Sequence, residues 1–129
     1  MQDRPSAPEL LDALAELLFA DVREWVPRER RFQVLVAANV CAVLARELRA
    51  GREPTAADIE LFARLAAEYE APRAESTDDE LLLEARAGAA ELARAIRAGD
   101  LDDELPAVMG HLRAHVRRKL DVARPGYAD

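Results

Sequence analysis

One stretch decides the fold: residues 34–45 read VLVAANVCAVLA, and only Asn39 among them is polar. A helix with this sequence carries apolar side chains around its whole circumference, and such a helix is typically surrounded by other helices. It is predicted to run from about Glu29 to Ala50, with Gly51 as its C-terminal cap. We therefore expect an all-α, single-domain bundle of about five helices around a central buried second helix.

Four further helices are indicated by capping residues and by apolar side chains at helical spacing. Ser6 with Glu9 and Thr77 with Glu80 have the spacing of capping boxes, and Thr55 with Asp58 is predicted to open the third helix. The predicted bounds are Ser6 to Trp25, Thr55 to Pro72, Thr77 to Gly99, and Asp102 or Asp103 to just before Pro125. The domain is expected to span residues 1–129, with flexible ends at about 1–5 and 124–129 and a loop at about 71–77.

Gly88 lies in the middle of the fourth predicted helix, on a face of small residues. Because glycine costs about 1 kcal/mol of helix propensity there, we expect a neighbouring helix to approach it closely. The same small face permits two copies of the chain to meet, which predicts self-association.

The composition excludes some classes of protein. The net charge is −7, which disfavours a nucleic-acid binder. Cys41 is the only cysteine, so neither an intrachain disulfide nor a cysteine-built metal site is expected, and a buried thiol fits a reducing compartment. No apolar run is long enough to cross a bilayer, and the N-terminus does not resemble a signal peptide. A cytoplasmic protein is expected.

The charged runs match the helix dipoles. Asp78–Glu80 and Asp102–Glu104 fall in predicted first turns, and Arg117–Lys119 falls in a predicted last turn. Helix dipoles favour this distribution, so the runs require no partner.

Two groups of polar residues are candidates for a binding site. His111, His115 and Lys119 follow one another at four-residue spacing. Two imidazoles at that spacing can face one metal ion, but two ligands do not hold zinc, so we favour histidines at the edge of the apolar face. Asn39 is predicted to be mostly buried and hydrogen-bonded, with Arg46 and Glu47 as candidates for the same polar layer. A structural hydrogen bond is favoured over a ligand contact.

Several stretches resemble an uncharacterised family of small bacterial helical proteins, a domain of unknown function. The resemblance rests on Met1–Ala7 before a Leu-rich helix, on Phe32–Asn39 followed by Arg46–Leu48, and on the ending His111–Arg113, Lys119–Leu120, Val122, Pro125 and Tyr127. Arg124, Gly126 and the stretch 72–90 depart from the family pattern. Members are often encoded beside aminoglycoside-phosphotransferase-like kinases and acyl-CoA dehydrogenases, so the resemblance implies an accessory role in acyl-CoA or organic-acid metabolism. It implies no catalytic residues.

No catalytic constellation is found in the sequence: the few hydroxyls are mostly caps, and no phosphate-binding glycine loop is present. We therefore expect no catalytic residues, no metal and no cofactor, and a non-enzymatic accessory or protein-interaction domain without nucleic-acid or membrane partners. The alternative is a small ligand-binding protein or enzyme with a polar pocket around Asn39, Arg46, His111, His115 and Lys119.

Overall fold

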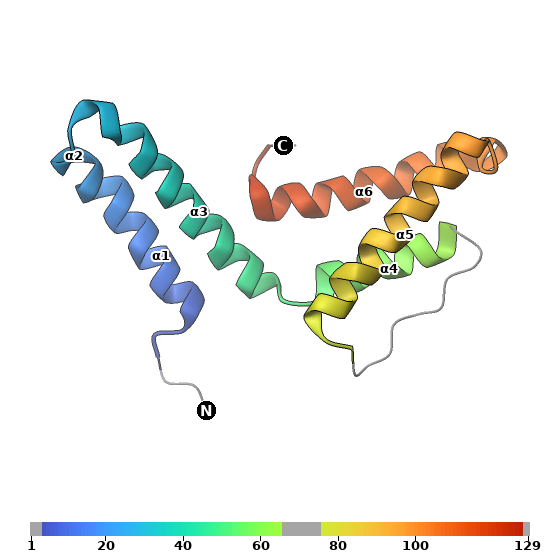
Figure 1. Cartoon of the computed structure of the whole chain (residues 1–129), viewed down its shortest axis with the longest axis horizontal. Helices are drawn as coiled ribbons and strands as arrows, with labels where there is room; N and C mark the ends of the chain where they lie inside the picture. Colours follow the sequence, from blue (N-terminus) through green and yellow to red (C-terminus); the bar gives the residue numbers. More distant parts are fainter. Residues whose placement is uncertain (1–3, 66–75, 128–129) are drawn as a thin grey trace. The chain divides into compact units, whose positions relative to one another are not determined.

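The computed structural model describes residues 4–65 and 76–127, and within these ranges every regular element is a helix and no strand occurs (Figure 1). The all-α prediction is confirmed. The elements are α1 (Ala7–Leu17), a π-helix (Leu18–Val22), α2 (Arg23–Trp25), a 3₁₀ turn (Arg28–Arg30), α3 (Arg31–Ala50), α4 (Glu53–Leu65), α5 (Asp78–Ala98), a second 3₁₀ turn (Asp102–Glu104) and α6 (Leu105–Ala123).

The chain forms two compact units, residues 1–51 with 121–129, and residues 52–120. The prediction of a single domain is not tested by this division and stays a prediction. Parts of the expected flexible ends and of the loop at 71–77, together with Pro72 as the end of the third helix, lie outside the described residues.

The first unit is built on a helical hairpin, in which α1 packs along α3 (Figure 1). The less exposed apolar residues of α1 and the π-helix share one helix face, because they follow one another at three- and four-residue spacing. They are Leu11, Ala15, Leu18 and Val22. Among the described residues of this unit, only Ala38 and Ala45 of α3 are fully buried. The core of the hairpin is therefore small.

The helix ends follow the predicted capping signals. Ser6 N donates to Glu9 Oε2 at 2.7 Å before α1, and Thr77 N donates to Glu80 Oε2 at 2.7 Å before α5. Gly51 and Gly99 end α3 and α5 with positive φ angles of 61° and 82°. Both capping boxes and both glycine stops are confirmed, because these local signals do not depend on tertiary packing.

The start of α4 differs from the prediction. The helix begins at Glu53, two residues before Thr55, because Pro54 fits the first turn of a helix and needs no backbone donor there. Thr55 is therefore inside the helix and does not cap it. Asp58, which was expected to complete the cap of Thr55, lies in the second turn.

The second unit has a larger core than the first. Its buried apolar residues come from three helices, namely Ile59, Leu61, Phe62, Leu81, Leu92, Ala95 and Val108. Gly88 of α5 is also buried, and a Cβ atom placed on it would lie 2.9 Å from the Cβ of Phe62 in α4. The predicted close approach at Gly88 is confirmed, but Phe62 of the same chain occupies this face. This face therefore packs inside the chain and does not present itself to a second copy, while self-association itself stays a prediction.

Helix α3 is less enclosed than expected. Ala38 and Ala45 face α1, but the opposite side of the helix is exposed, and the side chain of Asn39 is exposed as well. The prediction that Asn39 is mostly buried is wrong, and within its own unit α3 is covered on one side instead of being surrounded. The sequence shows that the centre of α3 is apolar around its whole circumference, but it does not show how many helices of the same unit pack against α3.

The contact between Gly88 and Phe62 predicts opposite effects for two glycine substitutions. Gly88→Ala should destabilise the protein by about 1–3 kcal/mol, because the new methyl group forces α4 and α5 apart. Gly110→Ala is the matched control in α6, where a Cβ meets nothing within 4 Å, and should stabilise by about 0.5–1 kcal/mol. Urea denaturation measures both. Equal effects of the two substitutions would contradict the tight packing at Gly88.

Candidate functional site

A polar cluster in the second unit joins α4 to α6. His115 Nδ1 donates to Asp58 Oδ1 at 2.6 Å, and Arg118 Nη2 donates to the same oxygen at 2.9 Å. The Asp58 and His115 side chains are each 13% exposed. His115 and Arg118 are three residues apart and so share one face of α6, while Asp58 reaches them from the second turn of α4.

The cluster has an apolar neighbour and one unsatisfied group. The imidazole of His115 packs edge-on against Phe62, with ring centroids 5.5 Å apart. The Nε of Arg118 is buried without a hydrogen-bond partner among the described residues. A carboxylate on Nδ1 fixes the orientation of the imidazole, as in many histidine sites, and here it also ties α6 to α4.

The other histidine and the lysine are not part of this cluster. His111 and Lys119 are exposed on α6, whereas His115 is mostly buried. In residues 4–65 and 76–127, no three His, Cys, Asp or Glu side chains gather closely enough to hold a metal ion. Arg118 was interpreted as part of a last-turn charge run, but α6 continues to Ala123 and Arg118 binds Asp58 instead.

Asn39 and Arg46 belong to the first unit, where they make different contacts. Arg46 donates from Nε to the Val122 carbonyl and from Nη2 to the Ala123 carbonyl at 3.3 Å, so it satisfies carbonyls at the end of α6. Asn39 instead lines an open groove of about 380 Å³ between α1 and α3. The other residues that line it are Ala15, Glu16, Phe19, Leu35, Ala38 and Ala42. No shared polar layer of Asn39 and Arg46 is seen.

The first unit also carries a row of exposed apolar side chains along α3, which we call the α3 row. Phe32 is 74% exposed, and the other four members are between 42% and 55% exposed. The row consists of Phe32, Val36, Val40, Leu44 and Leu48, each four residues after the last. The sequence analysis places Val36, Val40 and Leu44 in the buried centre of this helix, although the four-residue spacing also fits a single continuous ridge.

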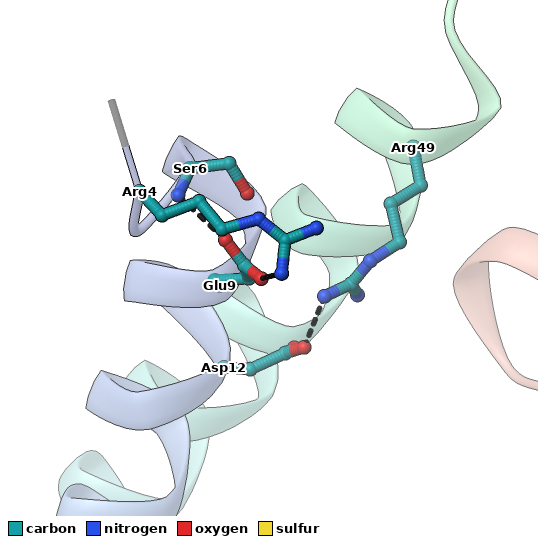
Figure 2. A network of polar contacts seen from close by, with 5 residues as sticks. All are labelled: Arg4, Ser6, Glu9, Asp12 and Arg49. Carbon is teal, nitrogen blue, oxygen red and sulfur yellow. Dashed lines mark hydrogen bonds and ion pairs between the residues drawn. The ribbon is translucent and has the colours of Figure 1, made fainter. Parts of the chain in front are cut away.

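The side of α3 opposite the row is fixed to α1 by a polar network (Figure 2). Arg49 of α3 donates to Asp12 of α1, and Glu9 accepts from the backbone of Ser6 and lies 3.8 Å from Arg4. The hydrogen bond from Arg49 lowers the pKa of Asp12, and it raises the pKa of Arg49. The backbone N–H of Ser6 lowers the pKa of Glu9. Among these contacts, the one between Arg49 and Asp12 joins α3 to α1, and the others are local to the start of α1.

The Asp12–Arg49 contact predicts an acid-sensitive contribution to stability. Because the folded state lowers the pKa of Asp12, the contribution is complete above the ordinary carboxyl pKa of about 3.9 and is lost as the pH falls through the lowered value. Asp12→Asn should therefore lower the melting temperature near neutral pH and have no effect in strong acid. Glu16→Gln removes the same charge from the same helix and should have a smaller effect. A difference that persists in strong acid would contradict the ion pair.

The cluster around Asp58 predicts a larger effect on stability than an exposed ion pair on the same helix. Asp58→Ala leaves His115 Nδ1 and Arg118 without their acceptor and should destabilise by about 1–3 kcal/mol. Glu60→Ala removes only the exposed pair with Arg64 and should cost about 0.5 kcal/mol or less. Chemical denaturation of the two variants measures the contrast. Equal losses would show that the cluster contributes little.

The part of the chain that the structure describes contains no helix that could span a membrane. Comparison with curated proteins and with solved structures found no match. Comparison with protein-family models matched residues 24–127 to a domain of unknown function, DUF6285. This range includes α3 to α6, and with them the α3 row and the Asp58 cluster. The chain therefore belongs to the DUF6285 family.

Proposed function

We propose that this chain is a non-enzymatic helical domain that binds a protein partner through the α3 row. The observation that supports this proposal most directly is the exposure of five large apolar side chains along one helix, with Phe32 74% exposed. Contiguous exposed apolar surface of this kind typically marks an interaction site, and a helix with apolar residues at four-residue spacing fits a helical or grooved partner.

The packing of the first unit supports this proposal. The two fully buried side chains described there are alanines, which contribute little apolar surface to a core. Helices gain most of their stability from burying an apolar face, so a hairpin that leaves the α3 row exposed to water is stabilised by any partner that covers the row. Binding and folding stability of this unit are therefore coupled.

The resemblance noted above supports a setting for this activity: a cytoplasmic bacterial protein that assists enzymes of acyl-CoA or organic-acid metabolism. The absence of a catalytic constellation in the sequence agrees with an accessory role.

A small ligand-binding protein is the second candidate, and it rests on one observation. The groove between α1 and α3 offers the amide of Asn39 and the carboxylate of Glu16 beside apolar side chains. A few polar groups in an apolar recess are typical of ligand sites. The groove is open, however, and Arg46 and the predicted residues His111, His115 and Lys119 are not among the residues that line it.

Capture experiments with an immobilised chain test the proposal. The wild-type chain should retain a partner in a fixed ratio, either another protein of its own organism or a differently tagged copy of itself. Val40→Asp places a charge in the middle of the α3 row and should reduce retention about tenfold or more.

The matched control is Leu83→Asp, which places the same charge at a 64% exposed leucine of α5 and should leave retention unchanged. Circular dichroism checks that both variants remain helical. Equal retention by the wild type and by Val40→Asp would contradict a binding role for the α3 row.

A further inference from the structure

We infer that the occupant of the α3 row is a second copy of this chain, with the two α3 helices antiparallel about a two-fold axis at Val40. This inference rests on the proposed function and names its partner. Three features of the described residues support it: the symmetry of the row, the place of its one charged neighbour, and the length of the ridge.

The α3 row is symmetric about its centre. In an antiparallel pair centred on Val40, two residues from the two copies face each other when their residue numbers add up to 80. Phe32 then faces Leu48 of the second copy and Val36 faces Leu44, while Val40 faces its own equivalent. Every pair is apolar on both sides, and every member is more than two-fifths exposed. An isologous interface requires this kind of self-complementary patch.

Charge distinguishes the antiparallel pair from a parallel one. Glu47 is the charged residue of α3 on the helix face that carries the middle of the row. In a parallel pair the two Glu47 carboxylates would face each other and repel. In the antiparallel pair each faces Gln33 of the second copy, and the rise of 1.5 Å per residue separates the two carboxylates by about 21 Å.

The groups that face Glu47 across this pair can bind a carboxylate. Gln33 Oε1 accepts from Arg30 Nη1 at 3.0 Å, which leaves the amide NH₂ of Gln33 able to donate. Arg30 lies one turn before Gln33 and places a positive charge beside it. An acidic residue at one end of α3 is therefore complementary to an amide and a guanidinium at the other end. The two-fold symmetry of the pair repeats this contact, so it occurs twice in the dimer.

The length of the ridge fits helix packing. Side chains four residues apart form the ridge that most often packs between helices, and the row extends over 17 of the 20 residues of α3, from 32 to 48. Antiparallel alignment also places the positive dipole end of each helix beside the negative end of the other.

Single-cysteine cross-linking of the full chain tests the register. In a Cys41→Ala background, Val40→Cys should form a disulfide-linked dimer on mild oxidation, because its two copies meet at the axis within disulfide reach. Val36→Cys and Leu44→Cys should each cross-link poorly alone, but a mixture of these two variants should form the mixed dimer. Cross-linking of all three variants to themselves would show a parallel pair and overturn the inference.

Sedimentation equilibrium of the uncross-linked chain tests the dimer itself. The wild type should associate, Val40→Asp should be monomeric, and Leu83→Asp should associate like the wild type. Glu47→Lys, at an exposed site that leaves the fold intact, should weaken association about two- to tenfold. Unchanged association of Glu47→Lys would overturn the antiparallel register.

The same measurements separate this inference from the proposed function. A wild-type chain that stays monomeric, yet retains another protein in a manner sensitive to Val40→Asp, overturns the second copy as partner and leaves the binding role intact. A chain whose association and capture are both insensitive to Val40→Asp overturns both.

Discussion

The first unit depends on one constraint: a helix that is apolar on two sides needs neighbours on two sides, and a hairpin supplies only one. Helix α1 covers the Ala38 and Ala45 side of α3 through small residues, which lets the two helices lie close together but buries little apolar surface. The five large side chains of the α3 row lie on the other side, whereas Leu35 lines the groove between α1 and α3. The hairpin thus covers one side of α3 and leaves the side with the α3 row uncovered.

The local part of the fold was predictable, and the tertiary part was not. The capping pairs at Ser6 and Thr77 and the glycines at 51 and 99 act within a few residues, so their effects follow from the sequence alone. The burial of α3 depends on how many helices reach it, which its own sequence does not contain. The start of α4 was only partly predictable. The sequence predicts a cap at Thr55, but the fixed φ angle of Pro54 favours a start two residues earlier, at Glu53.

The candidate site was predictable only in part for the same reason. His115 was identified as a residue of interest, but its partners come from α4, 57 positions earlier for Asp58, and no spacing rule connects the two. The sequence predicts Asp58 as a capping residue and Arg118 as part of a charge run, so neither is expected to contact His115. The α3 row was visible in the sequence, and its apolar character was interpreted as core because core and interface use the same side chains.

The π-helix at Leu18–Val22 widens one turn of the helix without interrupting it. Inserting one residue into a continuous α-helix rotates everything beyond it by about 100°, which would turn the apolar side of α1 away from α3. A π turn takes up the additional residue within one wider turn, so the helix continues to Trp25 without a loop. The π turn therefore keeps Leu18 and Val22 on the same side of the helix as Leu11 and Ala15.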